Sequence, residues 1–569
     1  MVQNPPSSRN NYVTISPIAT ILISLTLLFG YGEAMADYLL SIDVGTRSLR
    51  AALVSVTGGI IGQSVMPLVI HRPEAQRAEQ SSQNIWEQLI NAVRHVLADN
   101  PGVSPGQVLG IGFDSTYSML FLDQEHRPLP LSQTQTQAFD VLLWCDHRAM
   151  AEADQINRLN PASSASKSGG RVTAEMPVSR CYWMSQHRPT CWQATAHIIE
   201  LFDFLVLKAT GELIRSPCSF STRARYLATE DMGIGIYDRT EGPDLPHGAA
   251  VGEGLLADVA SQMGLLPGTP VSTGTVDGYA GTLAVMGAGL EGKTPADYER
   301  GLTSRISMVV GTSSIYQCFS SQTDTMPGIW GPWDNGDLAG LNAYTCGQNA
   351  LGALLDHLPC RHPAAAEVSD LANQAGVSVY DYLESRLTAL AKGQPIAELT
   401  RSLHILPFFA GNRCPIGDCH LTGMISGLGM DSGPDDMALL YLATIQALAL
   451  EARHALECLL QAGLPLETLM PAGGLTRNRL FMQEHVNVLG MPAILNREQN
   501  PMPLGAAMMA AVAAGVYPDI RSAIAGMSRV GETLVPESGL RAFYDKKYRV
   551  YREMHQDQVK YATVMDEEN

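Results

Sequence analysis

Two stretches of this chain repeat one pattern, and that pattern limits what the chain can fold into. Residues 38–55 and 306–319 each consist of two apolar, β-prone runs interrupted by a short turn rich in glycine, threonine and serine. The arrangement predicts two β-hairpins, because glycine allows a tight turn and the flanking runs favour extended backbone. Backbone N–H groups and hydroxyls at such turns can face phosphate oxygens. The repeat therefore predicts a duplicated fold whose two halves close on one nucleotide.

The first hairpin carries an acid at its tip, where Asp43 ends the first apolar run. A carboxylate beside a phosphate-facing turn can hold a hydrated Mg²⁺ through its oxygen atoms. We therefore predict that Asp43 is the metal-associated acid. The residues predicted to face phosphate are Gly45, Thr46 and Ser48 in the first hairpin and Gly311, Thr312 and Ser313 in the second.

Length and charge narrow the class of protein. A chain of 569 residues is longer than one hydrophobic core usually supports, so at least two domains are expected. The formal charge is −18 and no run rich in lysine or arginine occurs, which argues against nucleic acid or an anionic membrane as the main partner. The ten cysteines, including Cys414 and Cys419, form no paired CxxC sets. This distribution predicts free thiols in a reducing compartment and disfavours a zinc site.

The N-terminus allows two interpretations. An apolar run over residues 14–30 is followed by Ala34-Met35-Ala36, which matches the small-residue cleavage site of an exported protein. The run is short for a membrane span, however, and Met35 could be the true start. We favour a mis-set start or an unstructured extension over a working signal, because a site that uses a nucleotide has no substrate outside the cytosol. A cytoplasmic protein without stable membrane association is therefore expected.

Strands and helices alternate after the first hairpin, which is typical of an α/β fold. Residues 82–98 carry apolar side chains at helical spacing, and residues 108–123 are predicted to form two strands around an acidic turn at Asp114. Asp114 is a candidate for the pocket, although aspartate in a turn often bonds its own backbone. Residues 192–210 are predicted to be helical, with Gly211 as the stop signal.

A further apolar run brings several functional groups together. Residues 141–149 include Trp144, Asp146, His147 and Arg148. An aromatic wall combined with charged hydrogen-bonding groups can orient a small polyol in a cleft. The alternative interpretation is an Asp/Arg pair at the start of a helix.

Asp277 lies where a predicted strand gives way to a helix of small residues. A carboxylate at such a junction can project into a cleft. There it could accept a hydroxyl proton during phosphoryl transfer. Asp277 is therefore the candidate catalytic base.

Residues 287–294 match the P-loop expression letter for letter. The mechanism of that motif requires a hydrophobic strand before it and a helix that runs on from its Lys-Thr pair. Here a predicted helix precedes the motif, and Pro295 follows Thr294 at once. We therefore predict a surface loop between domains at this position.

The second half repeats the alternation of elements. A strand meets a turn at Gly473 and Gly474 and then a helix, which allows backbone to pass close to a nucleotide. Helices are also predicted to open at Gly347 and to span residues 441–462 and 503–515. The last of these has small residues that favour tight packing beneath the turn.

A set of motifs, in order and at family spacing, resembles the FGGY family of carbohydrate kinases. They run from about Tyr38 to Tyr517 and are Asp43-Val-Gly-Thr, Trp144-x-Asp-His-Arg-Ala, Gly311-Thr-Ser, Gly411-Asn-Arg-Cys-Pro, Gly423-Met-Ile-Ser-Gly-Leu, Gly473-Gly-Leu-Thr-Arg-Asn and Leu504-Gly-Ala-Ala. The ordered set is far more specific than any one motif. Within the family, the Gly-Phe-Asp-Ser-Thr and Trp-x-Asp-His-Arg-Ala stretches are most similar to the ribulokinase-like branch.

The resemblance implies an α/β, two-domain actin-like ATPase (ribonuclease H-like) fold with ATP and sugar in the interdomain cleft. It also implies transfer of the γ-phosphate to a sugar hydroxyl, with Asp277 as the base and Asp43 as the Mg²⁺-associated acid. Residues 311–313 would form the second phosphate loop. The residues implied for the adenosine loop are Gly473, Gly474, Leu475 and Asn478.

Three positions depart from the family pattern. Arg180 stands where this branch more often has lysine, Thr345 stands where a glutamate is expected, and Ala410 replaces a histidine. These changes leave the phosphate machinery intact and bear on the identity of the sugar. The predicted sugar contacts are Asp114, Trp144, Asp146, His147, Arg148 and Arg180.

We predict an ATP-dependent kinase that phosphorylates a pentulose, with ribulose favoured. The alternatives are a xylulose or polyol kinase of the same family and a non-catalytic, actin-like ATP-binding regulator. The sequence leaves open whether the protein forms a homodimer. The expected divisions are an extension (1–36), an N-terminal kinase domain with the sugar site and the base (37–286), a connection (287–304), a C-terminal ATP-binding domain (305–517) and a helical tail (518–569).

Overall fold

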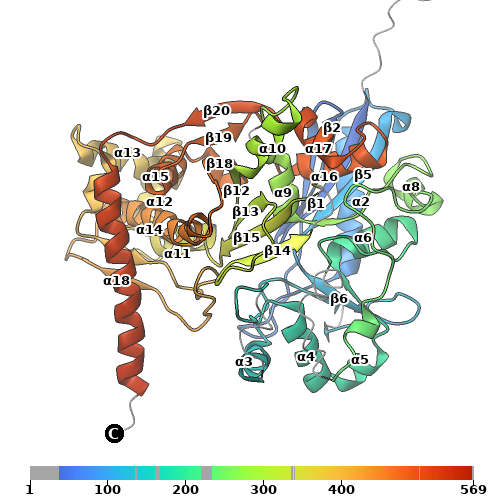
Figure 1. Ribbon diagram of the computed structural model, residues 1–569, viewed down its shortest axis with the longest axis horizontal. Coiled ribbons are helices and arrows are strands. Elements are labelled where there is room, and N and C mark those ends of the chain that lie inside the picture. Colours follow the sequence, from blue (N-terminus) through green and yellow to red (C-terminus); the bar gives the residue numbers. More distant parts are fainter. Residues whose placement is uncertain are drawn as a thin grey trace, which may run out of the picture. The chain divides into compact units, whose positions relative to one another are not determined.

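The computed structural model describes residues 37–134, 137–159, 167–219, 233–334, 338, 340–498 and 500–566. The predicted extension over residues 1–36 lies outside the described residues. Residues Tyr38–Asn569 form one compact unit. Two large mixed sheets, with helices packed against them, organise this unit (Figure 1).

The first sheet has the strand order β11-β5-β1-β2-β3. These strands are β11 (Thr275–Val276), β5 (Val108–Ser115), β1 (Tyr38–Val44), β2 (Ser48–Ser55) and β3 (Ile60–Pro67). β1 and β2 form the predicted first hairpin, in which Asp43 pairs with Arg50. β1, β5 and β11 run parallel, so their carboxyl ends meet at one edge of the sheet. Asp114 therefore lies in a strand beside Asp43, and not in the predicted turn.

The second sheet has the strand order β14-β15-β13-β12-β18-β19-β20. Its strands are β14 (Trp330–Asp334), β15 (Asn342–Gln348), β13 (Ser314–Ser320), β12 (Arg305–Val310), β18 (Thr468–Ala472), β19 (Ala493–Asn496) and β20 (Val530–Leu534). β12 and β13 form the predicted second hairpin, and β18 runs parallel to β12. The turn at Gly473 therefore lies beside the turn at Gly311. The segment 518–569, predicted to be helical, also supplies β20 at the edge of this sheet.

Helices α9 (Asp277–Met286) and α16 (Met502–Ala513) pack against each other and join the two sheets. α16 covers β1 and β5, whereas α9 packs on β12 and β18. Glycines make these contacts close: a Cβ on Gly112 of β5 would lie 2.0 Å from the Ala506 carbonyl oxygen, and one on Gly505 would lie 2.0 Å from that of Ala280. The predicted small-residue helix is thus present, and it packs against the first sheet although it comes late in the chain.

The first half contains further elements around a small sheet with the order β10-β6-β9-β4. The strands of this sheet are β4 (Glu79–Gln80), β6 (Met119–Leu122), β9 (Val141–Leu142) and β10 (His197–Glu200), and β7 (Ser132–Gln133) and β8 (Ala138–Phe139) form a separate hairpin. The helices are α2 (Ser82–Ala98), α3 (Met150–Leu159), α4 (Pro177–His187), α5 (Pro189–Ala194), α6 (Leu201–Thr210) and α8 (Ala257–Met263), with 3₁₀ turns η1 (Pro105–Gln107) and η2 (Tyr237–Arg239). α2 has the predicted bounds, and the Ser81 side chain caps it by accepting a hydrogen bond from the Asn84 N–H.

Helices dominate the rest of the second half. They are α10 (Pro295–Thr303), α11 (Gly352–Cys360), α12 (Ala365–Ala375), α13 (Val379–Ala391), α14 (Pro434–Gln461), α15 (Arg479–Leu489), α17 (Ile520–Met527) and α18 (Arg541–Asp566), with 3₁₀ turns η3 (Ile396–Thr400) and η4 (Gly474–Arg477) and a hairpin of β16 (His404–Leu406) and β17 (Met424–Ser426). α14 confirms the long predicted helix and begins seven residues earlier, at Pro434 rather than Tyr441. α18 contacts α14, α15 and β16 (Figure 1).

Two helix predictions in the interior of the chain are also wrong, and tertiary pairing explains both. Residues 192–210 are not one helix, because Ile198 and Ile199 pair with β6 as strand β10 between α5 and α6. Gly211 nevertheless ends α6 as predicted, with φ 80°. Gly347 does not open a helix but lies in β15, where a Cβ would come within 2.3 Å of the Ser314 carbonyl oxygen. The helix that follows, α11, begins at Gly352.

Candidate active site

A cavity of about 530 Å³ lies where the turns of the two hairpins face the start of α9. Residues from both sheets line it. Among the predicted site residues, the lining includes Asp43, Gly45, Thr46, Ser48, Trp144, Asp277, Gly311, Thr312, Ser313, Gly473 and Gly474. The sequence repeat thus brings two distant turns and the candidate base to one cavity.

Three acidic residues lie at the carboxyl ends of three adjacent parallel strands, and two of them, Asp43 and Asp277, line this cavity. Asp43 on β1 pairs in register with Asp114 on β5, and Asp114 pairs with Thr275 of β11, two residues before Asp277. The Gly278 N–H donates to the Asp277 carboxylate at 2.7 Å, as expected at a helix N-terminus. Strand register therefore gathers the carboxylates, and helix α9 orients one of them.

Burial and mutual repulsion shift the pKa of each acid upward. Burial, followed by the charges of Asp43 and Asp277, raises the pKa of Asp114 well above its usual range. Burial, reinforced by the charge of Asp43, raises the pKa of Asp277 to about 7. Burial also raises the pKa of Asp43, against the opposing effect of the Arg50 guanidinium, whose Nη1 lies 3.2 Å from Asp43 Oδ2.

The acid cluster has the chemistry of a site for a hard divalent cation. Among the described residues, neither carboxylate oxygen of Asp114 has a hydrogen-bond partner, although Asp114 is only 1% exposed. Buried carboxylates without partners are costly, and an oxygen-preferring cation would offset that cost. Asp43 and Asp114 are the residues placed to hold it, directly or through water.

The two hairpin turns are held rigid by bonds from neighbouring elements. In the first turn, Trp144 Nε1 donates to Thr46 Oγ1 at 2.9 Å, and the Gly45 N–H donates to the Ser48 carbonyl at 3.0 Å. In the second turn, the Gly311 N–H donates to the Ser313 carbonyl at 2.9 Å. Fixed turns of this kind can present N–H groups and hydroxyls to phosphate without reorganisation.

The turn after β18 reaches the cavity through Gly473, Gly474 and Arg477. Gly473 has φ 105°, and a Cβ there would lie 2.0 Å from the Val310 carbonyl oxygen, so this position requires glycine. Leu475 packs against the hydrophobic core of the second half. Asn478 Oδ1 caps α15 by accepting a hydrogen bond from the Phe481 N–H at 2.7 Å, and Asn478 Nδ2 donates to Glu384 and Tyr441 at 2.8 Å each. Leu475 and Asn478 therefore shape the turn and do not line the cavity.

Of the predicted sugar contacts, only Trp144 lines the cavity. Asp146 is fully buried, accepts a hydrogen bond from the Ala78 N–H at 2.7 Å and pairs with Arg148 at 2.7 Å. Arg148 also pairs with Glu79 at 2.7 Å. This arrangement is a buried ion-pair network that supports the loop.

Arg180 and His147 also act on the loop that carries Trp144. Arg180 is fully buried and donates to the Leu143 and Trp144 carbonyls at 2.9 and 2.6 Å. His147 Nε2 lies 3.3 Å from a Glu175 carboxylate oxygen. Both residues lie behind the cavity lining, next to groups that form it.

Glu175 and Arg413 line the cavity and were not among the predicted site residues. They form an ion pair of 2.8 Å between residues 238 positions apart, and the Arg413 guanidinium lies 5.6 Å from the ring centres of both Trp144 and Trp330. Burial alone would raise the pKa of Glu175, but Arg413 and then His147 outweigh it and lower the pKa to about 2. The available signal was the charged residue inside each motif, Ala174-Glu175-Met176 and Asn412-Arg413-Cys414.

The residues that depart from the family pattern are also placed by the structure. Thr345, on β15, lines the cavity. Ala410 is not among the lining residues, and its carbonyl accepts a hydrogen bond from Asn349 Nδ2 at 2.9 Å. Other lining residues outside the predicted site include Thr116, Tyr117, Arg477, Asn500 and Met502.

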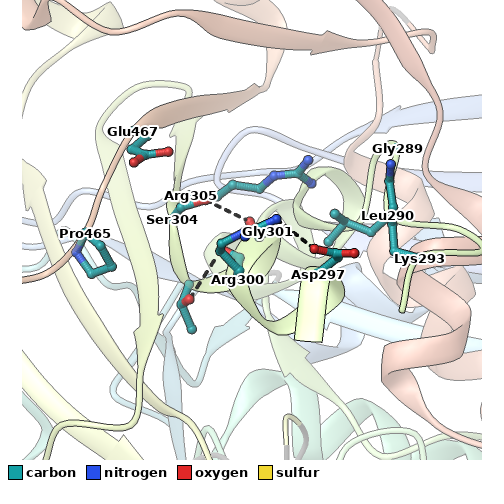
Figure 2. Close-up of a pocket in the computed structure, with 11 residues that line it drawn as sticks. Gly289, Leu290, Lys293, Asp297, Arg300, Gly301, Ser304, Arg305, Pro465 and Glu467 are labelled. Atoms are coloured by element: carbon teal, nitrogen blue, oxygen red, sulfur yellow. Dashed lines mark hydrogen bonds and ion pairs between the residues drawn. The ribbon is translucent and has the colours of Figure 1, made fainter. Parts of the chain in front are cut away.

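The P-loop-like stretch belongs to a different cavity, of about 660 Å³, shown in Figure 2. Gly289, Leu290 and Lys293 line it together with residues of α10, including Arg300, which pairs with Asp297 at 2.7 Å. The motif follows helix α9 rather than a strand. The strand that a P-loop requires is therefore missing, and residues 287–294 form a loop between α9 and α10.

Family models match both halves of the chain. The N-terminal domain of the FGGY family of carbohydrate kinases matches residues 38–284, and the C-terminal domain matches residues 306–514. An FGGY carbohydrate kinase domain-containing protein of Homo sapiens is 36% identical over 545 residues, which cover 93% of this chain and 98% of the human protein. The chain belongs to the FGGY family of carbohydrate kinases. This confirms the resemblance inferred from the ordered motifs.

More distant relatives and solved structures agree with this assignment. A D-ribulokinase of Saccharomyces cerevisiae is 30% identical over 522 residues, which cover 84% of this chain and 72% of the yeast protein. The crystal structure of xylulose kinase from Rhodospirillum rubrum has a TM-score of 0.71 at 20% identity and covers 92% of this chain and 99% of that chain. The predicted two-domain α/β fold is thereby confirmed.

Membership of the FGGY family makes the chain an ATP-dependent carbohydrate kinase, with ATP and a sugar as substrates. The predicted enzyme class is therefore confirmed, and the alternative of a non-catalytic regulator is disfavoured. Over the part of the chain that the structure describes, no helix is both long and apolar enough to cross a membrane. All ten cysteines are free thiols, as predicted.

Proposed function

We propose that this FGGY kinase transfers the γ-phosphate of ATP to a hydroxyl of a pentulose, with ribulose as the substrate. The observation that carries the proposal is the Asp277 carboxyl, which shares one cavity with both glycine turns and with Trp144. The choice of ribulose is supported by similarity to the yeast D-ribulokinase and to a ribulokinase of Geobacillus thermodenitrificans that is 29% identical over 91% of this chain.

Asp277 is proposed to act as general base. The sugar hydroxyl donates a hydrogen bond to the Asp277 carboxylate, and its oxygen attacks the γ-phosphorus in line with the bond to the departing ADP. As the new O–P bond forms and the old one breaks, the hydroxyl proton passes to Asp277. A pKa of about 7 suits this role, because a base is most effective when its pKa lies near the operating pH.

The nucleotide is proposed to lie along the glycine turns. Gly45, Thr46 and Ser48 would contact phosphate from the first hairpin, and Gly311, Thr312 and Ser313 from the second. The turn at Gly473 and Gly474 would pass beside the adenosine, with Leu475 and Asn478 holding it in shape. Mg²⁺ fits the acid cluster: Asp43 and Asp114 would hold it, and when bound it would neutralise charge on the phosphate oxygens.

The sugar is proposed to lie against Trp144, with Glu175 and Arg413 as hydrogen-bonding groups. His147 would act through Glu175, and Arg180 through the carbonyls next to Trp144. Asp146 and Arg148 would position this loop through their buried pairing. Because the base, the phosphate-facing turns and the Trp144 indole lie in one cavity, closure around the substrates would exclude water and suppress ATP hydrolysis. We place this reaction in the cytosol, where ATP is available.

A panel of sugars tests the proposal. Purified full-length protein is incubated with ATP, Mg²⁺ and each of D-ribulose, L-ribulose, D-xylulose, ribitol and gluconate, and ADP release is measured against a control without sugar. We expect the highest kcat/KM with a ribulose, and phosphorus NMR should show a sugar phosphate ester. A higher value with xylulose or a polyol would replace ribulose by that substrate, an outcome that threonine at position 345 in place of a carboxylate would help to explain.

A further inference from the structure

A group of metal-binding side chains lies outside the catalytic cavity. Ligand atoms of Asp418, Cys419 and His420 all lie within 4.8 Å of one another. A fourth donor comes from helix α3, where Asp154 Oδ2 lies 3.5 Å from His420 Nε2. A carboxylate, a thiol and an imidazole are the donor types that zinc accepts, and four donors complete its tetrahedral coordination.

The backbone orders this group before any metal binds. The His420 N–H donates to Asp418 Oδ1 at 2.9 Å, and the Asn412 N–H donates to the Asp418 carbonyl at 2.8 Å. Gly411 has φ 73° and lies against the Cys419 backbone, where a Cβ would come within 2.6 Å of the Cys419 Cα. These contacts fix the backbone, so rotation of side chains alone would bring the donors to zinc.

The side chains have the freedom that this rotation requires. His420 is 54% exposed and Asp154 is 34% exposed. Zinc bonds of about 2.0–2.3 Å place tetrahedral ligand atoms roughly 3.5 Å apart. The Asp154–His420 pair already has this spacing, and the ligand atoms of residues 418–420, which lie within 4.8 Å of one another, would draw together on binding. Arg171, at 3.8 Å from Asp418, is 43% exposed and can turn away into solvent.

The four donor side chains come from both halves of the chain. Asp154 belongs to the first half of the chain, whereas Asp418, Cys419 and His420 belong to the second. The loop that ends at Asp418 begins at Asn412, whose amide donates to Glu451 at 2.7 Å, and its next residue, Arg413, lines the catalytic cavity. A cation bound by all four groups would therefore tie the two halves together through the loop that presents Arg413.

We propose that Asp154, Asp418, Cys419 and His420 form a zinc site that restrains the two halves of the kinase and thereby lowers turnover. The site uses none of the residues proposed to bind ATP, Mg²⁺ or sugar. The spacing of Cys419 from the other cysteines argued against a zinc site when the sequence alone was considered. The structure supplies the missing ligands from a neighbouring histidine and from two aspartates.

Direct metal binding is tested with cobalt and zinc on the reduced full-length protein. Cys360 is exposed and lies three residues after His357 on α11, an arrangement that can bind metal by chance, so the reference protein is Cys360→Ser. Co²⁺ should produce a thiolate-to-cobalt charge-transfer band in this reference, and Zn²⁺ should abolish it. Cys419→Ser in the same background should lose the band, and a Cys419→Ser protein that keeps it would overturn the proposal.

The Kd for Zn²⁺ is then measured by isothermal titration calorimetry for variants of the proposed zinc-binding residues. His420→Asn and Asp154→Asn should each weaken binding by at least about tenfold, since even an outer-shell partner contributes roughly 10- to 100-fold. Equal affinity in Asp154→Asn and the reference protein would overturn the link between the halves.

Turnover is tested with Mg²⁺ in large excess, so that the nucleotide site stays occupied by Mg²⁺. Zn²⁺ should lower kcat several-fold in the reference protein, and a chelator selective for zinc should restore it. Cys419→Ser should keep its kcat at the same Zn²⁺ concentration. Equal inhibition of both proteins would assign the effect to another site and overturn the regulatory role. The sugar panel contains no zinc, so its result would not change and the proposed function would stand.

Discussion

Asp43 and Asp114 are paired in register on the parallel strands β1 and β5, and Arg50 is the cation that pairs with Asp43 at this edge of the sheet. Asp114 is buried and Asp43 is partly buried, and negative charges held side by side repel each other, so ionisation of this pair is unfavourable until a cation arrives. Asp277 adds a third charge at the end of the next strand. The same geometry that costs stability in the free protein thus prepares the site for phosphate and its counter-ion.

The first prediction concerns Asp277 as base. Asp277→Asn keeps the shape of the side chain but cannot accept the hydroxyl proton, so kcat for sugar phosphorylation should fall by about 10²- to 10⁴-fold. The Kd for ATP, measured by titration calorimetry, should stay within about twofold, because the turns at Gly45 and Gly311 are untouched.

The matched control for this variant is Asp258→Asn, a change of the same chemistry at an exposed position of α8. It should retain wild-type kcat. If Asp277→Asn also turned over sugar at near wild-type rate, Asp277 would lose its assigned role and another group would have to remove the proton.

The local parts of this site could be predicted from the sequence, and the non-local parts could not. The two hairpins and the strand-to-helix junction at Asp277 follow from apolar runs and turn residues within about twenty positions, so their positions were correct. The pairing of Glu175 with Arg413 joins residues 238 positions apart and depends on how the two halves fold together. No local pattern contains that information.

The loop around Trp144 shows how a correct motif can still mislead about individual residues. Its charged side chains suggested sugar contacts, yet Asp146 and Arg148 face Glu79 and Ala78 in the interior. Charge in a loop indicates that a partner exists but does not say which side of the loop it lies on. Strand β10 was missed for a related reason, because Ile198 and Ile199 gain more from pairing with β6 than from continuing a helix.

The second prediction is a pH dependence of stability that belongs to Asp277. Its pKa is raised to about 7 in the folded protein, so the folded state keeps a proton that the unfolded chain loses near pH 4. The contribution of Asp277 to the free energy of unfolding therefore decreases as the pH rises from about 4 to about 7. At pH 8 and without divalent cations, Asp277→Asn should be more stable than wild type by up to the order of 4 kcal/mol, since each pKa unit is worth about 1.4 kcal/mol.

Urea unfolding of both proteins at about pH 5 and about pH 8 measures this difference. Buried acids that do not interact with Asp277, such as Glu451, are present in both proteins and cancel in the comparison. The pKa of Asp114 depends on the charge of Asp277, so Asp114 contributes to the difference. Mg²⁺ should stabilise the wild type more at the higher pH, because the acid cluster is then ionised. Parallel stability profiles for the two proteins would contradict the assignment.

The third prediction concerns the close packing of α16 on the first sheet. Gly112→Ala would place a Cβ 2.0 Å from the Ala506 carbonyl oxygen, a backbone atom that cannot rotate away. Helix α16 would have to move, so the variant should lose on the order of 2–4 kcal/mol of stability. Gly110→Ala meets the Ala510 carbonyl oxygen at 2.7 Å and should cost less.

Gly102→Ala is the control, because no atom lies within 4 Å of the added Cβ. Its thermal midpoint should match wild type or exceed it slightly, as expected when a glycine is replaced at an unstrained position. If all three alanine variants shifted the midpoint equally, close approach of α16 would not explain the choice of glycine in β5.

The last prediction separates structure from function in the pair of Glu175 and Arg413. Removing the guanidinium with Arg413→Ala leaves a buried carboxylate without its main partner, which should cost about 3–5 kcal/mol of stability. Glu175→Gln with Arg413→Ala should recover much of that loss, because no charge is then left buried and unpaired. Arg413→Lys keeps the charge but loses the planar guanidinium that lies 5.6 Å from the ring centres of Trp144 and Trp330, so it should remain folded and raise the KM for sugar at least tenfold. Unfolding curves and sugar saturation curves for the four proteins measure both effects. A lysine variant with an unchanged KM would show that Arg413 only neutralises Glu175 and does not contact the sugar.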